Sequence, residues 1–308
     1  MNPTRPSEVR VLLEQQNLRP LKALGQNFLI DANILNIILD AAQVTAEDHV
    51  LEVGPGLGVL TGPLARQARH LTAVEKDHGL YEYLRTTFDA DPKVTLIHSD
   101  LLDLDLAALL GTGITRVVSN LPYSVGTVIL VNLIQAQHRL QGITVTLQQE
   151  VAERLVAPPN HPAYGLLSIW GQMDYEIALV KRIKPTCFYP PPRVTSAIIG
   201  LTLRPQPLVP LDPRDFFYAV TKRAFGKRRK QLQTILTGEA HSLGLMPGAI
   251  PDILNELGLD PKHRPEALGP TEWGLLTNAL WRQRSALHPA QKHPGGSSSR
   301  KTDPATLI

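Results

Sequence analysis

Short apolar runs alternate with longer amphipathic stretches between residues 48 and 203. The runs cover residues 49–54, 70–77, 94–100, 116–123, 143–148 and 196–203. Such alternation is typical of a largely parallel sheet with helices on both faces. Ahead of it, Asp31 can cap a helix over residues 32–43, whose apolar positions recur at helical spacing. The pattern predicts an α/β domain, with residues 21–30 as a loop laid against it.

The chain changes character at residues 205–213, where four of nine positions are proline. Proline continues neither a helix nor a sheet easily, so this run is predicted to be a linker. Helical spacing returns in short stretches at residues 216–225, 227–236, 251–258 and 271–283. From residue 288 onward Pro, Gly, Ser and Lys dominate. We expect an α/β domain over residues 1–204, a small all-helical domain over 205–287 and a disordered tail over 288–308.

Composition narrows the class of protein further. The 308 residues contain no apolar stretch of the roughly 20 residues that a membrane span needs, and the first residues lack a secretory signal core. We therefore expect a cytoplasmic protein without membrane attachment. Cys187 is the only cysteine, which excludes an internal disulfide and a cysteine-built zinc site, and we expect no metal. Nothing in the chain indicates more than a monomer.

Charge is distributed unevenly along the chain. The formal net charge is +3, but residues 1–204 carry 17 basic and 19 acidic side chains, and the remainder carries 14 and 9. This asymmetry suggests a polyanionic partner for the C-terminal part. The densest basic segment of the chain consists of Lys222, Arg223, Lys227, Arg228, Arg229 and Lys230. On a helix these residues cannot share one face, so several of them must point to solvent, where they can contact phosphates. The alternative is a charged helix face that is only solvated.

Three successive apolar runs end in residues suited to a nucleoside. The first run leads into a glycine-rich turn, Gly54-Pro-Gly56-Leu-Gly58, which lets a ligand approach the backbone closely. Glu75 ends the second run, where a carboxylate can accept hydrogen bonds from both ribose hydroxyls, and Asp100 ends the third. An acidic pocket suits a sulfonium cation better than a pyrophosphate. The glycine turn and Glu75 alone would also be compatible with a nicotinamide-dependent oxidoreductase, so this class of enzyme remains an alternative.

The fourth run ends in Asn120, Leu121, Pro122 and Tyr123, at the edge where open sheets bind ligands. An adenine amine is a poor nucleophile because its lone pair is delocalised into the ring. The side-chain carbonyl of Asn120 and the backbone carbonyl of Leu121, held by the fixed φ of Pro122, can accept both amine hydrogens during attack. Tyr123 offers a flat face on which a flipped base can stack. The alternative is a simple Asn-x-Pro turn.

Eight motifs follow one another in a family-specific order: LGQNFLID, LEVGPGLGVLT, AVEKD, SNLPY, LQQEVAERLVA, AYGLLSI, FYPPPRVTSAI and AFGKRRKQLQ. In these motifs the chain resembles the small-subunit ribosomal RNA adenine dimethyltransferases, collinearly from about Leu24 to Leu280. The resemblance implies a Rossmann-like class I methyltransferase domain with a helical C-terminal domain. It also implies S-adenosylmethionine as cofactor, S-adenosylhomocysteine as product, and dimethylation of two adjacent adenines in a 3′-terminal hairpin loop of small-subunit RNA, within an immature 30S-type subunit.

The resemblance also assigns roles to residues of this chain. Glu75 would hold the ribose, Asp100 the adenine amine and Asn120 the reacting site. Phe188 would close over the target base opposite Tyr123, although a core aromatic fits its pattern equally well. The basic segment matches the family's RNA-contacting region. The expected cofactor residues are Gln26, Asn27, Leu29, Gly54, Gly56, Glu75, Lys76, Asp100, Leu101 and Asn120, and the expected catalytic residues are Asn120, Leu121, Pro122, Tyr123 and Phe188.

Two departures and two alternatives accompany this interpretation. Lys76 replaces the aliphatic residue expected after the ribose acid, and the segment after His288 has no recognised counterpart. Large-subunit RNA adenine methyltransferases of the macrolide-resistance type are the nearest alternative, but the long helical part containing LGLDPKHRPEAL favours the small-subunit enzymes. The second alternative is a non-enzymatic ribosome-assembly or transcription factor with the same fold. The intact NLPY sequence and cofactor acids argue against it.

Overall fold

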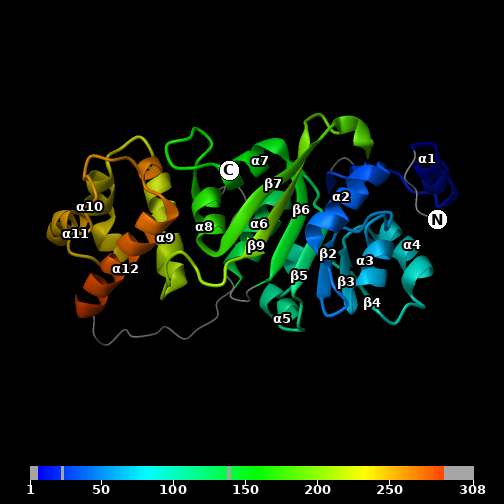
Figure 1. The fold of residues 1–308 in the computed structure, drawn as a ribbon, viewed down its shortest axis with the longest axis horizontal. Helices are drawn as coiled ribbons and strands as arrows, with labels where there is room; N and C mark the ends of the chain where they lie inside the picture. Colours follow the sequence, from blue (N-terminus) through cyan, green and yellow to red (C-terminus); the bar gives the residue numbers. More distant parts are fainter. Residues whose placement is uncertain (1–5, 22–23, 137–139, 288–308) are drawn as a thin grey trace. The chain divides into compact units, whose positions relative to one another are not determined.

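Seven strands form one sheet in the order β4-β3-β2-β5-β6-β9-β7 (Figure 1). The computed structural model describes residues 6–21, 24–136 and 140–287. Strands β2 to β6 pair in parallel with their neighbours, and β9 runs antiparallel to β6. The strands are β2 His49–Val53, β3 His70–Glu75, β4 Val94–His98, β5 Arg116–Asn120, β6 Gly142–Gln148, β7 Tyr175–Ile183 and β9 Ser196–Leu203.

The α/β prediction is confirmed, and each predicted run coincides with a strand. All five positions of β2 are buried, as expected for a strand covered on both faces. Strand β7 is the one strand of this seven-stranded sheet that the apolar pattern missed. It is one of the two edge strands and mixes buried, half-buried and exposed residues, so its sequence contains no continuous apolar run.

The chain order reverses between β2 and β5, which are adjacent in the sheet although β3 and β4 separate them in the sequence. At such a switch point the connections leave in opposite directions, and a crevice opens beyond the carboxyl ends of the strands. The fold therefore places the ends of β2, β3 and β5 around one potential ligand site.

The helix predicted over residues 32–43 is present as α2, which covers Ala32–Ala42. Asp31 caps α2, its carboxylate accepting hydrogen bonds from the backbone N–H groups of Asn33 and Ile34. The sheet-containing unit comprises the described residues up to Glu153 together with Glu176–Leu203. Its helices are α1 Pro6–Gln15, α2 Ala32–Ala42, α3 Thr61–Gln67, α4 His78–Phe88, η2 Leu101–Asp103, α5 Leu106–Leu110, α6 Gly126–Gln135 and η3 Pro185–Cys187, and α7 Gln149–Val156 crosses its boundary.

The segment predicted as a loop over residues 21–30 contains a short strand. Strand β1 Phe28–Leu29 pairs antiparallel with β8 Phe188–Tyr189. Phe28 lies opposite Tyr189 and Leu29 opposite Phe188 in this two-stranded ribbon. The pairing brings the N-terminal segment beside the loop that precedes β9. A strand of only two apolar residues is too short for the sequence pattern to predict it or its partner.

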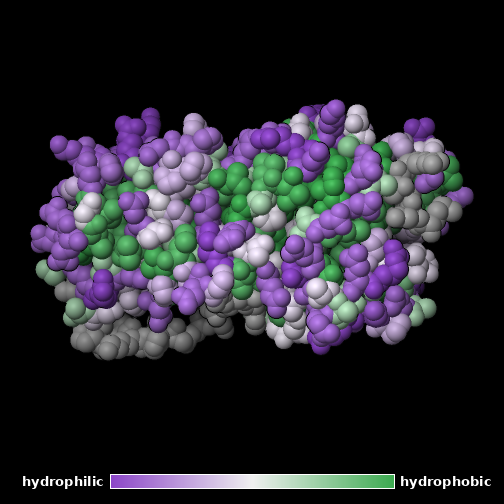
Figure 2. All heavy atoms as spheres, viewed as in Figure 1, coloured by the Kyte–Doolittle hydropathy of each residue, from purple (hydrophilic) through white to green (hydrophobic). Residues whose placement is uncertain are grey.

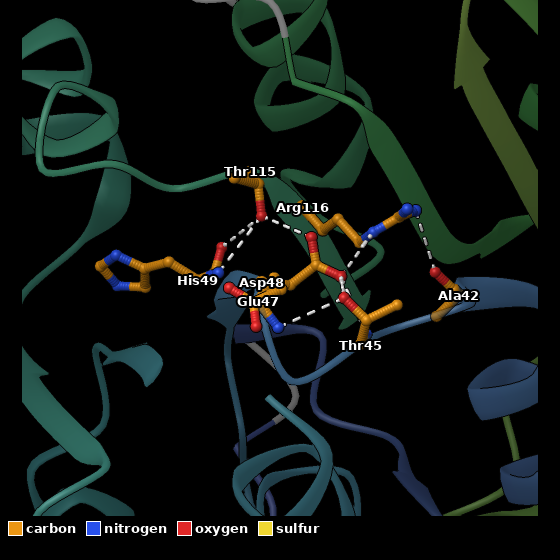
Figure 3. A network of polar contacts seen from close by, with 7 residues as sticks. All are labelled: Ala42, Thr45, Glu47, Asp48, His49, Thr115 and Arg116. Atoms are coloured by element: carbon orange, nitrogen blue, oxygen red, sulfur yellow. Dashed lines mark hydrogen bonds and ion pairs between the residues drawn. The ribbon is translucent and has the colours of Figure 1, made fainter. Parts of the chain in front are cut away.

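A buried polar network ties the amino-terminal ends of the strands together (Figure 3). The carboxylate of Asp48 accepts hydrogen bonds from the Thr45 backbone N–H at 2.8 Å and the Thr115 hydroxyl at 2.8 Å, and it pairs with Arg116 Nε at 3.0 Å. Burial alone would raise the pKa of Asp48, but these hydrogen bonds and the Arg116 charge lower it below its ordinary value. The network lies at the sheet edge opposite the ligand crevice, so we assign it to stability.

The helical unit comprises Arg154–Tyr175 and the described residues from Arg204 onward. Helix α8 packs against α9 and α12, and Trp170 Nε1 donates to the Thr221 hydroxyl at 3.0 Å. Hydrophilic residues gather at the margin around α10 and α11 (Figure 2). The helices are α8 Leu166–Asp174, α9 Arg214–Phe225, α10 Leu232–Leu243, η4 Pro247–Ala249, α11 Ile250–Glu256, η5 Pro265–Ala267 and α12 Pro270–Leu287.

The division of the chain differs from the sequence-based boundary at residue 204. Residues 154–175 group with the helices and not with the sheet, because the apolar face of α8 is buried against α9 and α12. A single cut in the sequence cannot represent a segment that leaves one unit and returns. The predicted tail over residues 288–308 lies outside the described residues. Within the described ranges, no helix combines the length and apolar character that a membrane crossing requires.

Candidate functional site

A cavity of about 200 Å³ opens beyond the carboxyl ends of β2, β3 and β5. It is lined by the glycine-rich turn, by the N-terminal segment before α2, by the ends of the strands and by the turn after β5. All the cofactor residues expected from the sequence line it, namely Gln26, Asn27, Leu29, Gly54, Gly56, Glu75, Lys76, Asp100, Leu101 and Asn120. The fold thus brings five distant segments of the chain to one place.

Glycine is required in the turn that follows β2. Gly54 and Gly56 have φ angles of +65° and +61°, in the left-handed region that side chains rarely adopt. A Cβ atom on Gly56 would also lie 3.2 Å from the ring of Phe28. The Gly54 N–H donates to the backbone carbonyl of Val74 at 2.9 Å, which fastens the turn to β3. The turn consequently exposes backbone to the cavity where a side chain would fill it.

Glu75 is 5% exposed at the end of β3. Its Oε2 accepts from the Gly56 backbone N–H at 3.1 Å and its Oε1 from the Asp77 N–H at 2.8 Å. Burial raises the pKa of Glu75, and these two hydrogen bonds oppose the rise. Each carboxylate oxygen has a further lone pair, so the group can accept two more donors from the cavity.

Lys76 and Asp100 form an ion pair at the rim of the cavity, with Lys76 Nζ 2.8 Å from Asp100 Oδ2. The Lys76 side chain is 57% exposed and that of Asp100 is 19% exposed. The other oxygen of Asp100 accepts from the Leu102 backbone N–H at 2.9 Å. A lysine at the position where an aliphatic residue was expected therefore orients the neighbouring acid.

Asn120 ends β5 and its amide orientation is fixed by the N-terminal segment. Its Nδ2 donates to the backbone carbonyl of Asn27 at 3.0 Å. Its Oδ1 is buried and has no hydrogen-bond partner among the described residues. A buried acceptor without a partner costs free energy comparable to a lost hydrogen bond, so such atoms usually meet a ligand or water. The site therefore presents an unused acceptor next to the cavity.

Leu121, Pro122 and Tyr123 also line the cavity, but Phe188 does not. Phe188 is 2% exposed and packs in the apolar core that includes Leu29, Val118 and Ile198. Its ring lies edge-on to that of Tyr123, with centroids 6.4 Å apart and planes at 74°. The structure brings the two aromatic residues together, but not as two parallel faces between which a base fits.

Glu52 is a cavity residue that the sequence analysis did not select. It lies in the middle of β2, is 1% exposed and accepts a hydrogen bond from the Thr61 hydroxyl at 2.7 Å. Burial raises the pKa of Glu52 to about 8, the Thr61 hydrogen bond opposes this, and the nearby Glu75 charge adds to it. An acid inside an otherwise apolar strand was the available sequence signal.

The predicted RNA-contact residues lie in the helical unit, at the end of α9 and in the turn before α10. They do not occupy one helix, because α9 ends at Phe225. Glu239 pairs with both Arg223 and Lys227, and Glu266 pairs with Arg228. The described part of the chain supplies no ion-pair partner for the remaining three, Lys222, Arg229 and Lys230.

The residues around the cavity fit a nucleoside that carries a positive charge. Three carboxyl groups and a single ammonium group occur among the described residues that line it. The glycine turn is not followed by a cluster of basic side chains that would favour a pyrophosphate. Sheet order, glycine turn and strand-end acids together define a Rossmann-like methyltransferase.

Comparison with known proteins identifies the family. The model of the family described as ribosomal RNA adenine dimethylase matches residues 17–246. Ribosomal RNA small subunit methyltransferase A of Shouchella clausii is 40% identical over 283 residues, covering 90% of this chain and 95% of that protein. The protein of the same name from Clostridium perfringens is 36% identical over 281 residues, covering 91% and 97%. The chain belongs to the ribosomal RNA adenine dimethylase family.

Solved structures agree on the fold. A dimethyladenosine transferase from Plasmodium falciparum has a TM-score of 0.70 at 20% identity, covering 83% of this chain and 98% of that one. The 23S rRNA methyltransferase ErmE has a TM-score of 0.62 at 24% identity, covering 82% and 99%. At these identities the likeness supports the architecture and not the substrate.

Proposed function

We propose that this protein uses S-adenosylmethionine to dimethylate the exocyclic amines of two adjacent adenines in a hairpin loop near the 3′ end of small-subunit ribosomal RNA. The single observation that carries the chemistry is the buried Oδ1 of Asn120 at the end of β5, which has no hydrogen-bond partner among the described residues. Two curated relatives, 40% and 36% identical to this chain, are named ribosomal RNA small subunit methyltransferase A, which supports the choice of RNA.

Asn120 prepares the amine for attack in this proposal. Oδ1 accepts a hydrogen bond from one amine N–H, and the backbone carbonyl of Leu121 accepts one from the other. The amine nitrogen then becomes pyramidal, and its lone pair is no longer delocalised into the ring. The hydrogen bond from Nδ2 to Asn27 keeps Oδ1, and not the amide nitrogen, directed at the substrate. No general base is needed before attack, because the nitrogen reacts as a neutral amine. The methylated nitrogen carries a positive charge and releases its proton to solvent after the transfer.

The acidic residues hold the cofactor. Glu75 accepts the two ribose hydroxyls while its backbone hydrogen bonds fix the carboxylate. Asp100 accepts the adenine amine and is oriented by Lys76. When bound, S-adenosylmethionine supplies a methyl group on a sulfonium centre. The positive charge of that centre is stabilised by the carboxyl-lined cavity.

The helical unit supplies contacts to RNA phosphates in the proposal. Lys222, Arg229 and Lys230 are the basic residues best placed for this, because acidic neighbours do not neutralise them within the described structure. We further propose that the substrate is an immature 30S-type subunit, that the enzyme acts as a monomer, and that methylation accompanies subunit biogenesis.

The decisive experiment incubates the protein with radiolabelled S-adenosylmethionine and small subunits that lack the modification, followed by nucleoside analysis. Dimethyladenosine at two adjacent adenines is expected. Protein-free large-subunit RNA, the substrate suggested by the likeness to ErmE, should remain unlabelled in the parallel reaction. Label on the large-subunit RNA alone would overturn the proposed substrate, and binding of subunits without any label would indicate a non-enzymatic factor.

A further inference from the structure

Ser196 contacts the proposed target-base site from β9, a strand that carries none of the expected cofactor or catalytic residues. It is the first residue of β9 and is fully buried. Its hydroxyl shares a hydrogen bond with the phenol oxygen of Tyr123, 73 positions earlier in the chain. The Tyr123 ring is therefore held at its backbone end by the turn after β5 and at its far end by β9.

The Tyr123–Ser196 bond completes a closed circuit of contacts around the reacting centre. Asn120 Nδ2 bonds to the Asn27 carbonyl, and β1, which follows Asn27 directly, pairs with β8. Strand β8 contains Phe188, whose ring forms a T-shaped pair with the Tyr123 ring. The loop after β8 then leads to Ser196, which bonds to the same Tyr123.

This circuit fixes the plane of the Tyr123 ring. A tyrosine held only by its backbone can rotate about two side-chain bonds, and a second anchor at the phenol oxygen removes most of that freedom. Burial raises the pKa of Tyr123, with the Ser196 hydrogen bond opposing the rise, so the phenol remains uncharged at neutral pH. A stacking face of fixed orientation keeps the adenine amine in line with Asn120, three residues away.

We propose that Ser196 is a positioning residue for methyl transfer, whose hydroxyl holds the Tyr123 ring in the orientation that stacks the target adenine. The inference rests on the proposed function, because it assumes that a base stacks on Tyr123. It adds a residue of β9 to a site otherwise built from the N-terminal segment before α2 and the residues at the carboxyl ends of β2, β3, β4 and β5. If Ser196 only filled space in the core, its hydroxyl would have no effect on the reaction through Tyr123.

The test compares Ser196→Ala, Tyr123→Phe and the double variant in the full chain. With unmodified small subunits and saturating cofactor, each single variant should lower kcat/KM roughly tenfold, the amount that loss of one hydrogen bond at a reacting group can cause. The double variant should lose no more than either single variant, because both remove the same bond. Affinity for S-adenosylhomocysteine, measured by calorimetry, should stay unchanged.

A matched control is Ser168→Ala. Ser168 is also fully buried, but its hydroxyl bonds to the Arg154 carbonyl in the helical unit. This variant should lose a comparable amount of thermal stability and keep its kcat/KM. Wild-type kcat/KM in Ser196→Ala, additive losses in the double variant, or a parallel loss of S-adenosylhomocysteine affinity would each overturn the positioning role.

A fluorescence measurement separates this inference from the proposed function. A synthetic RNA hairpin with 2-aminopurine at the target position lacks the reactive amine, so its signal reports stacking without methylation. The wild type should quench the fluorescence of the extruded base, and Ser196→Ala should quench it several-fold less. Quenching that does not differ between the two proteins contradicts the inference, even where the wild type methylates RNA. A wild type that quenches but never methylates contradicts only the proposed reaction.

Discussion

Asn120 Nδ2 donates a hydrogen bond to the backbone carbonyl of Asn27, 93 positions earlier in the chain, at 3.0 Å. The bond joins the end of β5 to the segment that leads into β1. It determines which atom of the Asn120 amide is left for a substrate. The amide oxygen is the atom left over, which is the atom that an amine can donate to.

The first prediction concerns the role of Asn120 in the reaction. Asn120→Ala should lower kcat on unmodified small subunits by about 100-fold or more, because one preorganised contact to the reacting group is lost. Affinity for S-adenosylhomocysteine should change by no more than about threefold. Single-turnover kinetics and calorimetry measure the two quantities, and Asn33→Ala, an exposed asparagine in α2, is the control. A variant that binds neither cofactor nor RNA would show damage to the shared site instead.

Glu52 provides a pH prediction. Its pKa is raised to about 8 in the folded protein, above the value of about 4.3 expected in the unfolded chain. Folding then takes up a proton between these values, so the carboxyl favours folding fully below the unfolded pKa and loses that contribution as pH rises through about 8. Glu52→Gln keeps an acceptor for Thr61 and should make the free energy of unfolding less dependent on pH.

Denaturant unfolding of the two proteins from pH 5 to pH 9 measures this effect. Wild type and Glu52→Gln should diverge with rising pH, the variant becoming the more stable by a few kcal/mol at the alkaline end. Glu47→Gln, at an exposed position, should follow the wild type throughout. Parallel curves for wild type and Glu52→Gln would mean that Glu52 ionises normally.

Much of this site follows from the ends of the apolar runs. Parallel strands place their carboxyl ends at one edge, so Glu75, Asp100 and Asn120 could be grouped without coordinates. Glu52 and Ser196 could not be found from strand ends, because Glu52 lies within β2 and Ser196 is the first residue of β9. At such positions the sequence does not show whether a side chain points toward the cavity. The β1–β8 pairing depends on residues 159 and 161 positions apart, which local patterns do not encode.

The helical unit shows the same limit. The helices could be predicted from apolar spacing, but α8 precedes β7 and β9 in the sequence and still packs with α9 and α12. Its apolar face has the same pattern whichever partner covers it. The ion pairs of Arg223, Lys227 and Arg228 were equally hidden, since their acidic partners lie 12 or more residues away.

Asp48 gives a stability prediction of the opposite sign to that of Glu52. Because the folded pKa of Asp48 lies below its ordinary value, its carboxylate stabilises the fold above the unfolded pKa of about 4 and stops doing so as pH falls through the folded pKa. Asp48→Asn should lower the free energy of unfolding by about 3 kcal/mol at pH 7, because it leaves the Arg116 charge without its buried partner.

Urea unfolding at pH 7 and at pH 3 tests this, with kcat measured on the folded variant. The difference between wild type and Asp48→Asn should shrink at the lower pH, where the wild-type carboxyl approaches protonation. The kcat should be unchanged, since none of the residues of the network drawn in Figure 3 lines the cavity. A kcat loss as large as that of Asn120→Ala would show that the network reaches the active site.

The last prediction separates RNA contacts from internal ion pairs in the basic segment. Arg229 and Lys230 are exposed and have no ion-pair partner in the described structure, whereas Lys227 pairs with Glu239. Each side chain that neutralises a phosphate adds about 0.7 to 0.9 to the slope of log affinity against log salt concentration. Arg229→Gln with Lys230→Gln should therefore reduce that slope by about 1.5, and Lys227→Gln should reduce it much less.

Binding of unmodified small subunits between about 50 and 200 mM salt measures the slopes. The double variant should also bind more weakly at low salt, while its affinity for S-adenosylhomocysteine stays that of the wild type because the cavity lies in the other unit. Equal slopes for Lys227→Gln and the double variant would mean that Glu239 releases Lys227 to the RNA. An unchanged slope in the double variant would remove Arg229 and Lys230 from the interface and direct the search to Lys222 and the ion-paired arginines.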